Sequence, residues 1–436
     1  MAYDIIVGRD ASDKKKFGGK GLIFLGKGYV KMGNYTSLSN KIWMDVARSH
    51  VILVAGKRGS GKSYTLAGIA EEISSLPQET AKNIASIIFD TMGIFWTMKY
   101  KNEKDFQLLK EWGLESKNLP VKVFVPFGKS EEYRKRSIPF DSTFALGSSE
   151  LEAEDWITLF NLDLTSLTGT LIERTITNLK EQKINFSIKD IQNDIDSDEK
   201  ASKETKEIVS ALFSAANTWG IFSKEKEGTK IYDLITPSTT TVLDVSVYSS
   251  IGAFNIRALV ISLVCKKLFQ TRMNARKKEE IESIQHGQDY LTYKSERQEP
   301  LIWVFIDEIH EFLGKEEKTP ATDALIQLLR EGRQPGVSLV MATQQPGKLH
   351  SDAITQADII ISHRVTAKPD IETLNEIMQT YLLENIKQQM DNLPSIKGSA
   401  ILLDDNSERI YPIRVKPRAT WHGGEAPTAV KAEIKL

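Results

Sequence analysis

The stretch "SHVILVAGKRGSGKSYTLAGIAEEISSL" (residues 49–76) decides the fold of this 436-residue chain. It opens with an apolar, β-branched run that ends in glycine, which is typical of a buried parallel strand. Residues 56–63 then fit the pattern G-x-x-x-x-G-K-[ST], and the residues after them have the composition of a helix. Strand, glycine loop and helix follow in the order that a phosphate-binding loop requires. The stretch therefore predicts a nucleotide site.

The loop also predicts which residues hold the nucleotide. Glycines let successive backbone N–H groups turn inward to form an anion-binding nest, and the N-terminus of the following helix reinforces it. Lys62 is expected to reach the β- and γ-phosphates, and the Ser63 hydroxyl to bind Mg²⁺. The residues predicted to contact the nucleotide are Gly56, Lys57, Arg58, Gly59, Ser60, Gly61, Lys62, Ser63 and Tyr64.

A second motif, "WVFIDEIH" (303–310), supplies two acids at the end of an apolar strand. Asp307 suits the carboxylate on the Mg²⁺ side of a P-loop NTPase. Glu308 is suited to orient and deprotonate an attacking water. Two such acids alone also fit a solvated turn, but the upstream loop favours the catalytic interpretation. A switch GTPase is disfavoured, because that class uses a glutamine and the chain has no Asn-Lys-x-Asp segment.

Three further side chains are candidates for the catalytic machinery. Gln344 ends the strand in "LVMATQQPGKL" and is expected to contact the γ-phosphate or the water, although a structural glutamine also fits. Arg330 and Arg333 end the helix before that strand, from which an arginine can enter a neighbouring subunit's site. The alternative for both arginines is a favourable interaction with the helix dipole.

Alternating strands and helices predict an α/β fold, with a RecA-like P-loop NTPase core and a parallel-rich central sheet. Ligands of such sheets bind at the carboxyl ends of the strands, where Lys62, Asp90, Asp307 and Gln344 all fall. We expect five segments: a small N-terminal β subdomain with a reduced, barrel-like cap (1–45), the first part of the core (46–100), a helical insertion (101–235), the second part of the core (236–415) and a polar tail (416–436).

Composition narrows the class of protein. The chain is 41% hydrophobic and 26% charged, as in ordinary globular proteins, and no apolar run reaches the ~18 residues of a membrane helix. A single cysteine, Cys265, excludes an internal disulfide framework and is expected to be a core thiol. We therefore expect a cytoplasmic protein without a membrane partner. A net charge of −1 leaves nucleic-acid binding open, because a ring can confine its positive charge to a central channel.

The motifs together resemble the HerA branch of the HerA/FtsK ATPases. The resemblance covers about residues 45–424 and rests on "AGKRGSGKSYT", "IIFDTMGIFW", "WVFIDEIHEFLG", "EGRQPGVSLVMATQQP" and "VKPRATWHGG". It implies a homohexameric ring that hydrolyses ATP with Mg²⁺ between subunits and threads duplex DNA through its pore. It also implies a C-terminal tail that crosses to the neighbouring subunit and helps to cover the nucleotide.

The resemblance assigns roles residue by residue. It implies Mg²⁺ binding by Ser63 and Asp307, catalysis by Glu308 as the base, and γ-phosphate sensing by Gln344. Arg333, and with less support Arg330, would be the arginine that acts in trans. Arg48 matches another basic position that the family uses near the phosphates, and Asp90 matches a supporting acid.

The N-terminal β segment is about half as long as the barrel of archaeal members, so the partner docked there is left open. The resemblance implies a partner nuclease or a sirtuin-like effector, in antiphage defence or in DNA-end processing. Alternatives are an ATPase ring that acts mainly as a scaffold and regulator of an effector, and a secretion or conjugation ATPase of the VirB4 type. Lys99, Lys101 and Lys104 are weak candidates for a pore loop that contacts DNA, and a solvated surface turn is the favoured explanation for them.

Overall fold

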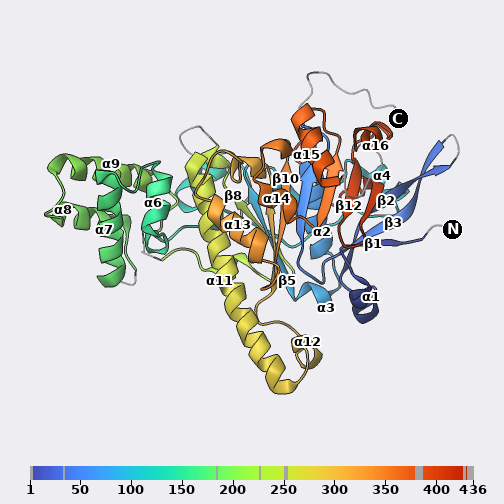
Figure 1. Cartoon of the computed structure of the whole chain (residues 1–436), viewed down its shortest axis with the longest axis horizontal. Coiled ribbons are helices and arrows are strands. Elements are labelled where there is room, and N and C mark those ends of the chain that lie inside the picture. The colour runs from blue at the N-terminus through green and yellow to red at the C-terminus, as the bar shows by residue number, and fades with distance from the viewer. Residues whose placement is uncertain are drawn as a thin grey trace.

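One continuous sheet runs through the protein (Figure 1). The structure, a computed structural model, describes residues 3–32, 35–182, 185–224, 227–249, 254–378, 386–425 and 429. In spatial order the sheet contains β1 (Ile5–Val7), β3 (Tyr35–Asp45), β2 (Leu22–Met32), β13 (Arg409–Val415), β12 (Ser399–Asp404), β11 (Ile359–His363), β4 (Val51–Ala55), β10 (Val337–Thr343), β9 (Leu301–Ile306), β5 (Ile84–Asp90), β8 (Thr240–Asp244), β6 (Val121–Pro126) and β7 (Ser142–Phe144).

The centre of the sheet is parallel, from β11 to β7. All five residues of β4 are buried, and they alternate between two hydrophobic cores. Val51, Leu53 and Ala55 face one core, and Ile52 and Val54 face the other. A strand covered on both faces must be apolar throughout, which explains its continuous β-branched run. The predicted α/β fold with a parallel-rich sheet is confirmed.

Helices cover both faces of the sheet. Buried residues of α2 (Lys62–Ser74) belong to one core, and those of α11 (Phe254–His286) and α13 (Thr322–Glu331) belong to the other. The remaining helices, most of them short, are α1 (Ala11–Phe17), α3 (Gln78–Ala81), α4 (Phe106–Glu111), α5 (Ser130–Lys135), α6 (Ala153–Leu159), α7 (Leu167–Gln182), α8 (Ile188–Ser197), α9 (Lys203–Thr218), α10 (Ile231–Leu234), α12 (Tyr290–Tyr293), α14 (Ser351–Thr355), α15 (Lys368–Met378) and α16 (Ile386–Asp391).

The N-terminal strands continue the central sheet instead of closing into a barrel. β2 and β3 form a hairpin, β1 pairs with β3, and β2 pairs with β13. The stretch "GSAILLDDNSERIYPIRV" (398–415) predicts a hairpin, and β12 and β13 form it, pairing in register from Ser399 with Arg414 to Asp404 with Arg409. The N-terminal segment therefore joins the core through main-chain hydrogen bonds, and its separation at residue 45 stays a prediction.

Helices α6 to α9 form a lobe beside the sheet, on the left in Figure 1. Its centre is aromatic: the ring of Trp156 lies 4.9 Å from that of Phe213, 5.1 Å from that of Phe222 and 5.7 Å from that of Phe160. The predicted insertion at 101–235 is wider than this lobe, because β6 and β7 within that range extend the sheet. The boundaries of the insertion stay a prediction.

The sequence predicts a helix to about residue 280 and an exposed loop over 281–299, whereas α11 continues to His286. Its far end and α12 project beyond the sheet (Figure 1). Cys265, in the apolar half of this helix, is fully buried, as predicted for a core thiol. The sequence also predicts a helix near 370–391, of which residues 379–385 lie outside the described residues. None of the described helices combines the length and hydrophobicity that crossing a bilayer needs.

Candidate nucleotide site

The phosphate loop joins β4 to α2, as predicted. Gly61 has φ 114°, a conformation that glycine adopts without strain. A Cβ on Gly56 would lie 2.5 Å from Ser60 Oγ and 2.7 Å from His363 Cβ, so only glycine fits there. The first N–H groups of α2 have no intrahelical acceptor and point out of the helix toward the loop. The loop is therefore built to hold an anion.

The polar groups of the loop differ in how many hydrogen bonds they make within the protein. Lys62 is 5% exposed, and its Nζ donates a hydrogen bond to the Lys57 carbonyl at 3.3 Å. The Ser60 hydroxyl is buried without a hydrogen-bond partner among the described residues. The N–H of Lys57, in contrast, donates to the carbonyl of Arg364 at 2.9 Å, which anchors the loop to the end of β11. Lys62 and Ser60 are thus the groups best placed to meet phosphate oxygens.

Ser63 and Asp307, the two residues predicted to bind Mg²⁺, lie together. The Ser63 hydroxyl donates to Asp307 Oδ2 at 2.5 Å, although β10 separates their strands β4 and β9. Asp307 is 1% exposed, and its pKa is raised by burial against the opposing effects of Ser63 and Lys62. A hydroxyl and a carboxylate are hard oxygen ligands of the kind Mg²⁺ takes, with the other positions left to phosphates and water. The donor set fits the predicted cofactor.

Glu308 occupies a special backbone position next to this pair. Its φ is 51°, in the left-handed region that non-glycine residues adopt rarely and often at functional sites. The backbone of Gln344, the predicted sensor at the end of β10, favours the ionised form of its carboxylate and lowers its pKa. Burial, followed by the charge of Asp307, raises the pKa of Glu308 to about 7, against the attraction of Lys62. A carboxylate with such a pKa is suited to accept a proton near neutral pH.

His363, at the end of β11, packs against the phosphate loop. The sequence motifs did not identify this residue as part of the site. Burial lowers its pKa to about 4, so the ring is neutral. Its Nδ1 lies 3.1 Å from the Ser399 carbonyl and its Nε2 lies 2.9 Å from the Thr65 hydroxyl, while its side chain packs against Gly56. The signal for His363 was present in the sequence, since it is a polar residue that ends an apolar strand, like Asp307.

Asp90 is not brought to the phosphate loop, contrary to the supporting role implied for it. Two strands, β10 and β9, lie between β4 and β5. Both carboxylate oxygens of Asp90 accept N–H groups of the following turn, from Gly93 at 2.7 Å and Phe95 at 2.7 Å among others. Burial and the neighbouring Asp244 raise its pKa to about 8. Asp90 shapes the turn after β5, and its part in nucleotide binding is not supported by these contacts.

The candidate arginines also lie away from their own loop. Arg48 precedes β4 and pairs with Asp13 at 2.9 Å, and Arg333 precedes β10 with its NH1 3.9 Å from Asp358. These positions belong to the amino ends of the strands, whereas the phosphate loop follows the carboxyl end of β4. Arg330, at the end of α13, pairs with Asp352 at 2.7 Å. The structure therefore does not bring Arg48 to the phosphates of its own chain.

The start of the predicted tail is held by its own subunit. Glu71 of α2 is fully buried and accepts hydrogen bonds from Lys416 Nζ (3.2 Å), Ala419 N (2.6 Å) and Thr420 Oγ1 (2.7 Å). Burial opposes ionisation of Glu71, but the two cations Lys416 and Arg418 outweigh it and lower the pKa. The contact of residues beyond 420 with a neighbouring subunit stays a prediction.

Tyr64 receives this C-terminal segment beside the loop. Its hydroxyl accepts the N–H of Arg418 at 2.6 Å, and the ring of His422 meets its ring edge-on at 5.2 Å. Because Tyr64 directly follows Ser63, the segment 418–422 lies over the first turn of α2. Tyr64 is thus a link between the loop and the C-terminal segment.

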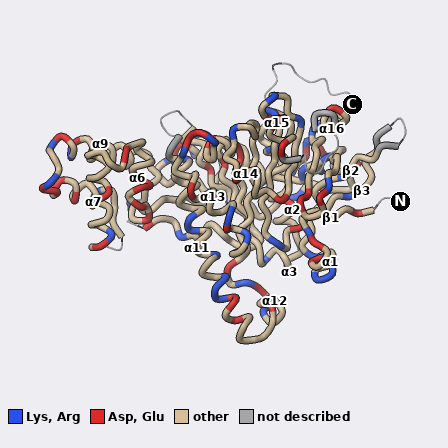
Figure 2. The backbone as a smooth tube through the Cα atoms, viewed as in Figure 1, with Lys and Arg blue, Asp and Glu red and all other residues tan. Residues whose placement is uncertain are grey.

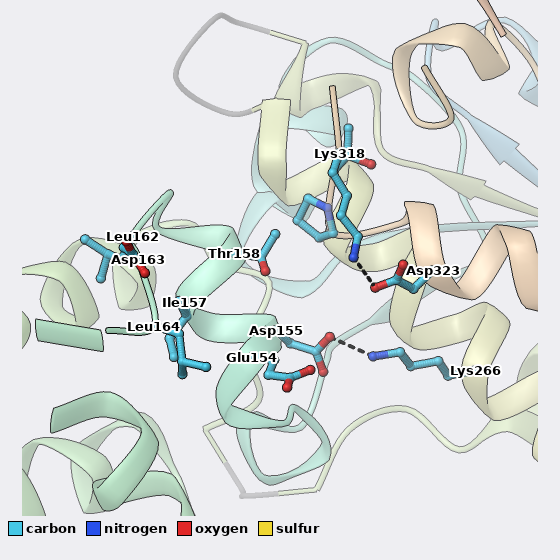
Figure 3. A pocket seen from close by; sticks show the side chains of 12 residues that line it. Glu154, Asp155, Ile157, Thr158, Leu162, Asp163, Leu164, Lys266, Lys318 and Asp323 are labelled. Atoms are coloured by element: carbon cyan, nitrogen blue, oxygen red, sulfur yellow. Dashed lines mark hydrogen bonds and ion pairs between the residues drawn. The ribbon is translucent and has the colours of Figure 1, made fainter. Parts of the chain in front are cut away.

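A separate cavity of about 570 Å³ lies between the lobe and the core (Figure 3). In Figure 3 Lys266 of α11 pairs with Asp155 of α6 at 2.7 Å, and Lys318 pairs with the nearby Asp323 at 2.9 Å. None of its lining residues belongs to the phosphate loop or to β9 and β10. The cavity has no part in the nucleotide site.

Comparisons with known proteins agree with this geometry. The family profile described as "Helicase HerA, central domain" matches residues 30–268, more than half of the chain. A profile of the ATPase family associated with various cellular activities matches residues 252–365, which include Asp307 and Glu308. The DNA double-strand break repair helicase HerA of Pyrococcus furiosus is 27% identical over 179 residues, which cover 37% of this chain and 30% of that relative.

Solved structures resemble the fold at low sequence identity. VirB4 of Thermoanaerobacter pseudethanolicus superposes with a TM-score of 0.55 at 12% identity, over 91% of this chain and 96% of that one. The bacterial conjugative coupling protein TrwB superposes with a TM-score of 0.52 at 14% identity, over 94% and 98% of the two chains. At such identities the likeness extends to the fold alone.

Proposed function

The chain belongs to the family of the HerA helicase central domain, a family of P-loop ATPases, and we propose that it is an ATP-driven motor that threads duplex DNA. The observation that carries the proposal is the arrangement of Ser63, Asp307 and Glu308. A hydroxyl and a carboxylate at 2.5 Å stand at the end of the phosphate loop, and a second carboxylate follows at once. A protein that only binds a nucleotide, without hydrolysing it, does not require that second carboxylate, whereas hydrolysis uses it as a base.

The proposed hydrolysis uses the chain's own groups in three roles. Lys62, Ser60 and the N–H groups at the start of α2 hold the phosphates of ATP. Ser63 and Asp307 hold Mg²⁺, which would neutralise charge on the β- and γ-phosphates. Glu308 takes the proton of the attacking water, because its carboxylate is largely desolvated and has a pKa of about 7.

We propose that the site is completed by a neighbouring copy in a homohexamer. A sheet presents its two ends to opposite sides of the molecule, so Arg333 before β10 cannot meet the phosphate loop after β4 of the same chain. Its side chain is 45% exposed and its contact with Asp358, at 3.9 Å, is loose. These features support Arg333 as the arginine that enters the neighbour's site. Arg330 is a weaker candidate because its guanidinium is closely paired with Asp352.

Duplex DNA and an effector protein are the proposed partners. The effector would be a nuclease or a sirtuin-like protein, and the process would be antiviral defence or DNA-end processing. Two of the three lysines considered for a pore loop are paired with acids, Lys99 with Asp141 at 2.5 Å and Lys104 with Glu425. In the view of Figure 2, Lys and Arg are interspersed with Asp and Glu over the body of the protein. The paired lysines favour a second candidate, an ATPase ring that assembles and regulates an effector with little translocation.

The test is the ATPase rate with and without duplex DNA, measured together with the molecular mass in solution. A motor is expected to assemble as a hexamer and to hydrolyse ATP several-fold faster with DNA, an effect that weakens steeply as salt rises because phosphate contacts release counterions. A hexamer whose ATPase ignores DNA and responds only to a partner would support the scaffold. A monomer indifferent to DNA would overturn both proposals.

A further inference from the structure

Thr343, at the end of β10, joins two parts of the site. Its backbone carbonyl accepts the N–H of Gly56 at 3.2 Å, which connects it to the phosphate loop. Its hydroxyl accepts the N–H of Gln345 at 3.0 Å and lies 3.2 Å from Nδ1 of His310. Thr343 is fully buried. A movement of this residue is therefore transmitted both to the loop and to the turn that carries Glu308.

His310 lies three residues after Asp307, and its Nδ1 atom is close to two oxygen atoms. Its Nδ1 lies 3.2 Å from Thr343 Oγ1 and 3.4 Å from Glu308 Oε2. Burial, followed by the charges of Lys348 and Lys62, lowers the pKa of His310 to about 4. The ring is therefore neutral and has a single N–H. With that hydrogen on Nδ1, His310 is a donor placed between the hydroxyl of one strand end and the carboxylate of the next.

The carboxylate of Glu308 has few other restraints. Its Oε2 is buried and has no hydrogen-bond partner of good geometry in the described part of the chain. Glu308 has a left-handed backbone conformation and directly precedes the short turn Ile309–Glu311. A buried carboxylate oxygen without a donor is costly unless a group close by can supply one. His310 is the side chain in position to do so.

We propose that His310 is a positioning residue, which holds the Glu308 carboxylate in register with Thr343 at the end of β10. The inference rests on the proposed ATP hydrolysis by Glu308. The Thr343 hydroxyl fixes the ring of His310, and the Nδ1–H that lies between the two oxygens orients the carboxylate. Because Thr343 also holds Gly56, this arrangement is connected to the phosphate loop. In the described part of the chain no hydrogen bond or ion pair joins His310 to Lys62 or Ser63, so its role concerns turnover and not nucleotide affinity.

The test compares four full-length proteins: the wild type, His310→Ala, His310→Asn and His310→Gln. The amide of asparagine reaches the position of Nδ1, whereas the amide of glutamine reaches the position of Nε2. We expect kcat to fall about 10–100-fold in His310→Ala and His310→Gln, because small displacements of a catalytic group have effects of that order. In His310→Asn, kcat should stay within about threefold of the wild type. KM and the Kd for ATP should change little in all three.

Thr343 provides an independent measurement. Thr343→Val keeps the shape of the side chain and removes its hydroxyl, and Thr343→Ser keeps the hydroxyl. Thr343→Val should lower kcat in the manner of His310→Ala, Thr343→Ser should not, and the double variant His310→Ala/Thr343→Val should be no worse than the poorer single variant. Such non-additivity is the mark of residues that act as one unit. Additive losses would overturn the link between the two.

The outcomes separate this inference from the proposed function. His286→Ala, at the exposed end of α11, is the matched control and should leave kcat unchanged. A wild-type kcat in His310→Ala, or equal losses in His310→Asn and His310→Gln, would overturn the role of Nδ1. A parallel loss of ATP binding would overturn it too, since it would indicate a structural role. A wild-type protein that binds ATP without turnover would instead overturn the proposed hydrolysis, and this inference with it.

Discussion

Charged groups are buried at both ends of the parallel sheet, but the two ends differ in how fully these groups are paired. At the amino ends the groups are paired with each other: His50 lies 2.7 Å from Asp358 and 3.2 Å from Asp45, and Arg9 Nε donates to Asp45 at 2.7 Å. At the carboxyl ends, Lys62 has one long hydrogen bond, of 3.3 Å, to a carbonyl. There, a buried carboxylate oxygen of Glu308 has no partner of good geometry among the described residues.

This difference distinguishes buried groups that stabilise the fold from buried groups that bind a ligand or take part in a reaction. A buried ion pair whose partners all come from the chain has its charges balanced within the fold, and removing one partner destabilises it strongly. A buried polar group with spare capacity costs stability, and its retention is best explained by a ligand or a reaction. The comparison therefore predicts that substitutions at the carboxyl ends change catalysis, and that those at the amino ends change stability or assembly.

The largest expected effect concerns Lys62 and Glu308. Lys62→Ala should lose ATP binding and all measurable turnover, because the phosphates lose their main cation. Glu308→Ala should bind ATP normally and lose turnover by about 10²–10⁴, the usual contribution of a general base. Binding by fluorescent nucleotide and steady-state ATPase assays distinguish the two, with Lys14→Ala on the exposed face of α1 as control. Wild-type turnover in Glu308→Ala would remove it as the base.

A smaller effect on turnover is expected for Arg333, which lies at the amino ends of the strands but is proposed to act at the phosphate loop of a neighbouring copy. Arg333→Ala should lower turnover about 10²–10³, as does loss of one group that stabilises the transition state. Mixing it with Lys62→Ala should restore part of the activity, since each protein supplies what the other lacks at a shared site. Arg330→Ala should lose less, because that side chain is taken up by Asp352. No recovery at any mixing ratio, in rings shown to contain both proteins, would argue that Arg333 acts elsewhere.

The smallest effect is a dependence of stability on pH. Burial alone would lower the pKa of His50, but Asp358 and Asp45 outweigh it and raise the pKa to about 9. The folded protein then keeps a proton that the unfolded chain, with a histidine pKa of about 6.5, releases. Stability from this group is complete below pH 6.5 and is lost as the pH rises through 9, by about 3 kcal/mol. Denaturant unfolding at several pH values measures the slope.

Two substitutions sharpen that last measurement. His50→Gln should flatten the slope between pH 6.5 and 9, and the exposed His286→Gln should leave it unchanged. Asp358→Asn should lower stability at neutral pH and flatten the slope as well, because the protonated imidazole loses its nearest carboxylate. An unaltered slope in His50→Gln would assign the pH dependence to another group.

The local part of the site was predictable from the sequence. The loop from Gly56 to Ser63, the strand before it and the helix after it are contiguous, so their motif specifies them together. The pairing of Ser63 with Asp307 was also predictable, because both follow strands of a parallel sheet and the two motifs occur together. His363 shares the signal of a polar residue at the end of an apolar strand and was missed because none of the motifs quoted from the sequence includes it.

The remaining assignments depended on the order of strands. Asp90 ends a strand of the same sheet, yet β9 and β10 lie between that strand and the loop, and its carboxylate is occupied by its own turn. Arg48 is close to the loop in sequence, but β4 lies between them and carries the two to opposite ends of the sheet. Proximity along the chain does not report proximity in a parallel sheet, since each strand spans its full width.

By itself, the sequence determined the class of fold and the chemistry of the loop, because glycine spacing, β-branched strands and a lysine–serine pair act over a few neighbouring residues. Only the tertiary structure decided which charged groups balance each other and which stay available. It joined Glu71 to Lys416, His50 to Asp358 and Thr343 to His310, over separations from 33 to 345 residues. Burial and partnership are properties of the packed molecule, and they separate a buried ion pair that holds the fold from one carboxylate, on Glu308, in position to act.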